Sequence, residues 1–165
     1  MSKKGFTLIE LLIVIAIIAI LAGVVFVSLD PLSRFRDARD AARYTDVTAI
    51  LSAIKVDQVD NKGPYTTELE NTTDGDTLVI GTDTTGCDYS INTGANCRVD
   101  TDDVACLDLT DLVTSGYLGK MPVNPNGNGA WTEAKTGYYL TKNTNGSVTV
   151  GSCDTESTAL IEVTR

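Results

Sequence analysis

An uninterrupted apolar run near the amino terminus is the feature that most constrains how this chain folds. Residues 11–27 (LLIVIAIIAILAGVVFV) have no polar side chain, and within residues 6–29 only Thr7, Glu10 and Ser28 are clearly polar. A helix of that length spans about 36 Å at about 1.5 Å per residue, which is enough to cross the roughly 30 Å hydrocarbon core of a bilayer. We therefore predict that this segment is a membrane-spanning helix.

Basic residues precede the apolar run and set its expected orientation. Lys3 and Lys4 stay in the cytoplasm by the positive-inside tendency, so the rest of the chain should face outward. A secretory signal peptide also begins with basic residues and has an apolar core, of about 7 to 15 residues. The run here is longer and no Ala-x-Ala cleavage site ends it, which favours an anchor over a conventional signal peptide.

The composition excludes several function classes. The chain has 165 residues, no histidine, and 13 basic against 22 acidic residues, for a net charge of −9. Without histidine, Ser-His and Cys-His nucleophiles and histidine-based zinc sites are ruled out, and no other catalytic constellation is present. A negative chain also repels phosphate backbones. We therefore predict a protein that is not an enzyme and that makes no direct contact with nucleic acid.

The residues at the start of the apolar run form a motif in fixed register. Residues 4–12 (KGFTLIELL) combine a basic residue, Gly5, Phe6 and Glu10 with the apolar run. This segment resembles the class III signal of type IV pilins and of type II secretion pseudopilins. The resemblance implies that a prepilin peptidase cleaves after Gly5 and methylates the new amino terminus at Phe6. It also implies that Glu10 pairs with the amino-terminal amine of a neighbouring subunit as a helical homopolymer grows.

The resemblance also implies partners, a location and a function. The partners are other copies of the chain, the peptidase and methyltransferase, the membrane, and an inner-membrane assembly platform with its ATPase. The subunit would cross the inner or cytoplasmic membrane once, with a cytoplasmic amino terminus, and then enter a cell-surface filament or a periplasmic pseudopilus. We expect a type IV pilin that supports adhesion, twitching motility or DNA uptake. The alternatives are the major pseudopilin of a type II secretion system and a membrane-anchored surface-binding protein that never polymerises.

The chain divides into four segments. We expect residues 1–5 to be a leader peptide, residues 6–30 the helix of the membrane or filament core, residues 31–62 an amphipathic half of the same helix, and residues 63–165 an extracytoplasmic head. We expect the helix to kink or restart at Asp30-Pro31, because Asp can cap a helix and Pro suits its first position.

The amphipathic half has an apolar stripe at helical spacing, which we expect to lie under a sheet. The stripe residues are Ala41, Tyr44, Val47, Ile50, Leu51 and Ile54. The opposite face carries charged side chains, which we expect to be solvated or, in a filament, to meet acidic groups of adjacent heads. These residues are Arg34, Arg36, Asp37, Arg39, Asp40 and Arg43.

The head is expected to contain short strands and one helix. We expect strands at residues 77–81, 138–142, 147–150 and 158–164. The second and third flank Asn143-Thr144-Asn145-Gly146, a strong hairpin signal because Asn and Gly tolerate positive φ. A helix is expected over residues 104–117, with Asp102 or Asp103 as its cap.

These elements predict an α+β fold. A three- or four-stranded antiparallel sheet packed on the stripe of the long helix accounts for most of the pattern. The resemblance implies the same arrangement, the pilin fold, in which the apolar half of a long amino-terminal helix protrudes from a small antiparallel sheet head. Residues 116–129 (GYLGKMPVNPNGNG) are rich in Pro and Gly and predict an ordered loop. This loop is similar to the one before the sheet of major pseudopilins, with Asn124 in place of the usual Asp.

Four cysteines lie in the exported part, at positions 87, 97, 106 and 153. Facing an oxidising compartment, they predict two disulfides, for which three connectivities exist. We favour Cys87 with Cys97, which closes a polar loop, and Cys106 with Cys153, which ties the short helix to the carboxy-terminal region. A four-thiolate metal site is disfavoured because the chain has no C-x-x-C pair.

Clustered acids raise the question of calcium. Asp100, Asp102 and Asp103, with Asp74 and Asp76, offer oxygen ligands, and the major pseudopilins that the chain resembles use a calcium site. Acidic residues equally suit turns and helix caps, and the twelve-residue spacing of an EF-hand is absent. We therefore predict no cofactor, with calcium as the alternative.

Overall fold

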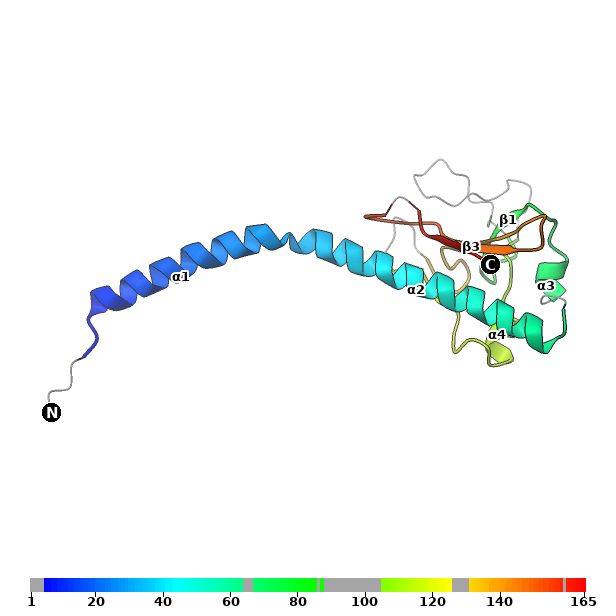
Figure 1. The fold of residues 1–165 in the computed structure, drawn as a ribbon, viewed down its shortest axis with the longest axis horizontal. Helices are drawn as coiled ribbons and strands as arrows, with labels where there is room; N and C mark the ends of the chain where they lie inside the picture. The colour runs from blue at the N-terminus through cyan, green and yellow to red at the C-terminus, as the bar shows by residue number, and fades with distance from the viewer. Residues whose placement is uncertain (1–4, 64–66, 86, 88–104, 126–130, 159) are drawn as a thin grey trace. The chain divides into compact units, whose positions relative to one another are not determined.

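The computed structural model of the chain falls into two compact units, Met1–Arg36 and Asp37–Arg165. The structure describes residues 5–63, 67–85, 87, 105–125, 131–158 and 160–165. The helices are α1 (Leu8–Leu29), α2 (Pro31–Asp60), α3 (Thr67–Glu70) and α4 (Thr110–Thr114) (Figure 1). The strands are β1 (Thr77–Val79), β2 (Tyr138–Lys142), β3 (Val148–Ser152) and β4 (Glu162–Thr164).

The first unit contains α1 and the beginning of α2. Asp30 ends α1 in the left-handed conformation, with φ 35°, which Asp tolerates better than most residues. α2 then begins at Pro31, so the predicted break at Asp30-Pro31 is confirmed. Every side chain from Leu8 to Ser28 is exposed, which leaves the apolar surface of α1 uncovered in the single chain.

The head contains a four-stranded antiparallel sheet in the order β1-β2-β3-β4, which confirms the predicted α+β class. The β2–β3 hairpin forms where it was expected, because the Asn143 amide donates to the Ser147 carbonyl and Gly146 adopts φ 79°. β4 is shorter than predicted. The amides of residues 156–158, which precede it, donate to the Asp40 carboxylate instead of to a neighbouring strand.

The main core lies between α2 and one face of the sheet. Cross-strand partners in one row of the sheet are Leu78, Leu140, Val150 and Val163. They share one hydrophobic cluster with Val47, Ile50 and Ile54 of α2. Tyr138 is fully buried in the same cluster, and its hydroxyl donates to Asp46 Oδ2 at 2.6 Å. Burial and then the Asp46 carboxylate raise the pKa of Tyr138, so the phenol stays protonated.

The buried stripe of α2 differs from the prediction toward its amino-terminal end. Tyr44 is 55% exposed and Ala41 is exposed, whereas Asp40 and Arg43 are buried. The expectation that Asp40 and Arg43 lie on a solvated face was therefore wrong. At helical spacing the buried stripe continues from Val47 to Arg43 and Asp40. Both charged side chains can be buried because the head supplies hydrogen-bond partners for them.

The helix predicted over residues 104–117 is mostly absent from the described part. Only Thr110–Thr114 is helical. Leu107 instead forms a parallel bridge with Ile80, so backbone hydrogen bonds to the sheet replace the expected helical ones. The proposed caps at residues 102 and 103 lie outside the described residues.

Asp57, near the end of α2, is a buried acid without a compensating cation among the described residues. Its side chain is 5% exposed, and Oδ1 accepts a 2.8 Å hydrogen bond from Asn61. Within the described residues Oδ2 has no hydrogen-bond partner. Burial and the nearby charges of Asp111 and Asp60 raise the pKa of Asp57. The ionised form therefore destabilises the head at neutral pH.

Replacing Asp57 with Asn is expected to stabilise the head by about 1 kcal/mol at neutral pH, because it removes a buried charge. Since the folded pKa lies above the unfolded value, the advantage should shrink as the pH falls and wild-type Asp57 takes up a proton. Urea unfolding at several pH values measures this. The exposed Glu133→Gln change is the control, and equal effects of the two changes would contradict the prediction.

Candidate functional site

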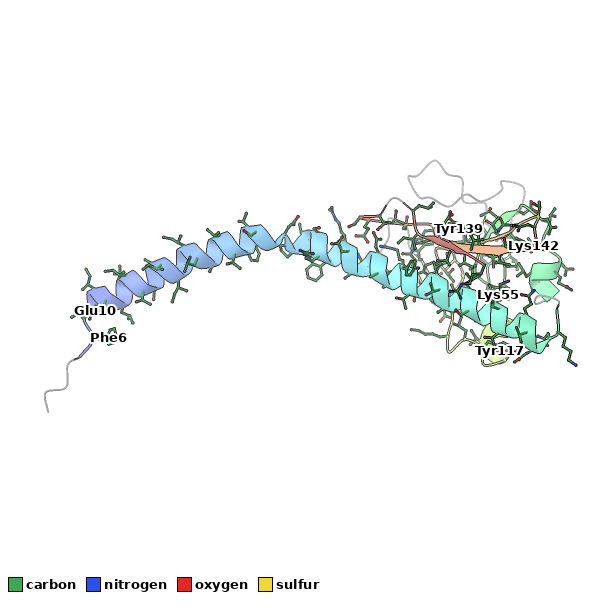
Figure 2. All side chains as sticks on the ribbon, viewed as in Figure 1. Phe6, Glu10, Lys55, Tyr117, Tyr139 and Lys142 are labelled. Atoms are coloured by element: carbon green, nitrogen blue, oxygen red, sulfur yellow. A yellow bond between two sulfur atoms is a disulfide. The ribbon has the colours of Figure 1, made fainter. Side chains whose placement is uncertain are left out.

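The predicted processing and assembly residues lie at the start of α1, where Figure 2 labels Phe6 and Glu10. Thr7 is the N-cap, and its Oγ1 accepts a 3.3 Å hydrogen bond from the Glu10 amide. In return, Glu10 Oε2 accepts from the Thr7 amide at 2.8 Å and from its hydroxyl at 2.7 Å. This capping box fixes the first turn. It holds Glu10 close to Phe6, where cleavage after Gly5 would create a new amine.

The helix that follows Glu10 is apolar on every side (Figure 2). Large side chains such as Ile20 and Phe26 are 68% and 70% exposed. Such side chains leave water only when lipid or other apolar helices cover them. Within the described residues, the helical run Leu8–Asp60 contains one stretch long and apolar enough to span a membrane, a test that a signal sequence also passes. α1 can therefore act as an anchor or as a packing surface for identical helices.

A cluster of polar side chains, which we call the head clamp, connects α2 to the loops beside β3. The head clamp consists of Arg39, Asp40, Arg43, Asn124 and Glu156. Arg43 is fully buried. Its guanidinium donates to Asp40 and Asn124 at 2.8 Å, to the Pro125 carbonyl at 2.7 Å and to Glu156 at 2.9 Å. Arg39 also forms an ion pair with Glu156, so two arginines of α2 hold one acid of the carboxy-terminal segment.

The head clamp satisfies the acids that it buries. Burial alone would raise the pKa of Asp40, but the amides of Ser157, Thr158 and Glu156, together with Arg43, hold that pKa below its ordinary value. The Arg39 guanidinium lowers the pKa of Glu156 to about 2 against the effect of burial, and Arg43 contributes in the same direction. Both acids therefore stay ionised at neutral pH and position the head on α2.

Acid is expected to weaken the head through these two groups. Because the folded pKa values of Asp40 and Glu156 lie below their ordinary values, both acids stabilise the fold fully at neutral pH, and this contribution is lost as the pH falls toward about 2. The urea concentration at the midpoint of unfolding should therefore decrease as the pH is lowered from about 6 to about 3. The Glu156→Gln variant should lose less stability than the wild type over this pH range. An equal loss in the variant and the wild type would contradict the assignment of the acid effect to Glu156.

The described cysteines correct the predicted pairing. Cys87 is bonded to Cys106, so both predicted pairs, Cys87 with Cys97 and Cys106 with Cys153, are wrong. The Cys106 amide donates to the carbonyl of Asp83 at 2.9 Å, which brings Cys106 beside the segment that carries Cys87. Cys153 is also disulfide-bonded, and Cys97 lies outside the described residues.

The calcium hypothesis remains an untested prediction. Its candidates Asp100, Asp102 and Asp103 lie outside the described residues. Among the residues that the structure does describe, no three His, Cys, Asp or Glu side chains gather as a metal site needs. Asp74, which was considered with them, forms a 3.1 Å ion pair with Lys142.

Sequence reasoning did not identify Asn124 or Glu156 as members of a site. The Asn124 side chain accepts from Arg43 and donates to the Gly137 carbonyl at 3.1 Å and to Ser152 Oγ at 2.8 Å. Its place in a loop rich in Pro and Gly gave no signal for this role. The helical spacing of Asp40, Arg43 and Val47 could have predicted that Asp40 and Arg43 lie on the buried face of α2. It gave no information about their partners in the head.

Comparison with known proteins bears on the amino-terminal segment. Residues 1–26 match the family model of the prokaryotic N-terminal methylation motif, the class III signal of type IV pilins and pseudopilins. Neither the curated proteins nor the solved structures gave a significant match. The motif, the apolar helix and the four-stranded antiparallel sheet together support a protein of the type IV pilin and pseudopilin kind.

Proposed function

We propose that this chain is a structural subunit of a type IV pilus, which polymerises through its amino-terminal helix and supports adhesion, twitching motility or DNA uptake. One observation carries the proposal. Glu10 lies within the matched methylation motif and at the start of a helix whose side chains from Leu8 to Ser28 are all exposed. A helix of this kind needs an apolar environment, and a bundle of identical helices in a filament core supplies one once the subunit leaves the membrane.

The major pseudopilin of a type II secretion system remains the second candidate, because its subunits carry the same class of signal. The disulfide-tied head favours the pilus, since a covalently braced head suits exposure at the cell surface. A short, simple sheet favours the pseudopilin. A membrane-anchored protein that never polymerises would need the helix but would leave the carboxylate of Glu10 without a role in assembly.

The proposal includes partners and a membrane orientation. A prepilin peptidase would cleave after Gly5 and methylate Phe6, and an inner-membrane platform with its ATPase would then add the subunit to the filament. Lys3 and Lys4 would keep the amino terminus in the cytoplasm before cleavage. The head would face outward, where the disulfide between Cys87 and Cys106 is stable.

Processing gives a direct test of the motif. Replacing Gly5 with Leu should leave the precursor uncut, because the peptidase would then meet a bulky side chain at the cleavage position. Amino-terminal sequencing and intact mass should find a methylated Phe6 in the wild type and the leader still attached in the variant. A variant that is still cut before Phe6 would refute the cleavage site.

Electron microscopy of filaments sheared from cells tests polymerisation itself. Antibody raised against the head should label wild-type filaments along their length, and their absence would favour the pseudopilus or the unpolymerised anchor. Neighbouring genes then separate the two assembly candidates. A retraction ATPase supports the pilus, whereas an outer-membrane secretin encoded with secretion partners supports the pseudopilin.

A further inference from the structure

A groove lies beside α2 on the head, next to the head clamp. It encloses about 720 Å³ and is lined by α2 and by the segment that leads into β4. Its apolar lining includes Tyr44 and Leu160, which stay 55% and 46% exposed, and the small side chain of Ala41. Exposed apolar groups of this size gain free energy when a partner covers them. The groove therefore suits an apolar partner.

The same groove also carries acidic side chains, and we call it the acidic groove. Asp37 and Glu162 both line it and are exposed. Among the described residues the Asp37 carboxylate has no hydrogen-bond or ion-pair partner, and the Glu162 carboxylate accepts a 3.2 Å hydrogen bond from the Tyr139 hydroxyl. Both carboxylates are available to a cation. Asp40 also lines the groove, but its charge is already balanced in the head clamp.

A surface of complementary chemistry lies on the first turns of α2, and we call it the basic ridge. Leu32, Phe35 and Arg36 follow i, i+3, i+4 spacing in the helix, so they share one face. Leu32 and Phe35 are 68% and 61% exposed. Among the described residues Arg36 has no ion-pair partner. The basic ridge thus presents two large apolar groups beside an unpaired guanidinium.

Both surfaces stay exposed in the single chain, and each offers what the other lacks. The chain is also acidic, with a net charge of −9, so heads brought side by side repel unless cations meet the acids. We propose that the basic ridge of one subunit docks in the acidic groove of a neighbouring copy, with Arg36 facing Asp37 and Glu162. This inference rests on the proposed function, because it needs subunits that assemble.

Photo-crosslinking in intact filaments tests which surface occupies the acidic groove. Tyr44 is replaced with p-benzoylphenylalanine, which keeps an aromatic side chain at the exposed wall, and the filaments are irradiated. Cleavage before aspartate releases the ridge as residues 30–36 (DPLSRFR), so mass spectrometry can find it joined to the groove peptide. The proposal expects this product between two chains. Crosslinks to α1, to lipid or to another segment would overturn it.

Charge reversal tests the polar half of the contact. Arg36→Glu and Glu162→Arg should each reduce filament yield about tenfold, because like charges would then face each other, and the two together should recover most of it. The control variant Glu133→Arg makes the same change of charge as Glu162→Arg, but at an exposed residue outside the acidic groove. It should leave the filament yield unchanged. Normal yields from both single variants, or no recovery in the combined variant, would overturn the pairing.

The two levels of proposal fail in different ways. If the wild type forms filaments but the ridge peptide is never crosslinked, the docking contact is wrong and the pilus proposal stands. If the wild type forms no filaments, the proposed function fails first and the docking inference fails with it.

Discussion

A Glu10→Ala variant is expected to lose filaments almost completely while its precursor still enters the membrane. In a filament core the amine at Phe6 would be surrounded by apolar side chains, and Glu10 is the only carboxylate in residues 6–29 that can balance it. Removing one partner of a buried ion pair costs about 3 to 5 kcal/mol, which is roughly 100- to 4,000-fold in an association constant. The yield of sheared filaments, measured by immunoblot, should fall by at least about 100-fold.

The structure suggests a sharper variant, because Glu10 also belongs to a capping box with Thr7. Gln can replace Glu at this position of a capping box, so Glu10→Gln keeps the cap and removes the charge. If Glu10 acts by pairing, this variant should fail as Glu10→Ala does. Normal filaments from Glu10→Gln would show that the residue acts only as a cap.

Thr7→Ala is the matched control for that comparison. It removes the side chain of the N-cap, which contributes about 1 kcal/mol, and leaves the carboxylate of Glu10 in place. Filament yield should then fall by no more than about tenfold. A loss as large as that of Glu10→Ala would mean that the first turn of α1, and not the charge, limits assembly.

The features that were predicted correctly are encoded locally. The apolar run predicts α1 from composition alone, Asp30-Pro31 predicts the break before α2, and Asn143–Gly146 predicts the hairpin, because each signal lies within a few neighbouring residues. The α+β class follows from these elements. Relations between distant residues decided the rest of the fold.

Arg43 illustrates why distant relations were missed. A charged residue on a helix is usually solvated, and its partners Asn124 and Glu156 lie 81 and 113 residues further along the chain. No local pattern announces such contacts. The disulfide between Cys87 and Cys106 was missed for a related reason, since sequence spacing allows several pairings and the tertiary contact of Cys106 with Asp83 is not visible in the sequence.

Replacing Arg43 with Met is expected to destabilise the head by about 3 to 5 kcal/mol. The side chain is fully buried. Its replacement removes the guanidinium that binds both Asp40 and Glu156, and it leaves Asn124 Oδ1 without the hydrogen bond that it accepts from Arg43. Truncating one side of a buried charge network has this typical cost. Heat unfolding of the full chain in detergent, followed by the near-ultraviolet signal of Trp131, should show a midpoint lower by roughly 10 °C.

Two further variants locate the origin of that loss. Arg39 pairs with Glu156 but is 32% exposed, so Arg39→Met should cost only about 1 kcal/mol. Adding Asp40→Asn and Glu156→Gln to Arg43→Met removes the unpaired acids and should recover part of the stability. Recovery would show that the lost stability comes from the unpaired acids. If no stability is recovered, the loss comes from the packing of the arginine side chain itself. Equal losses from Arg39→Met and Arg43→Met would contradict the central role of Arg43.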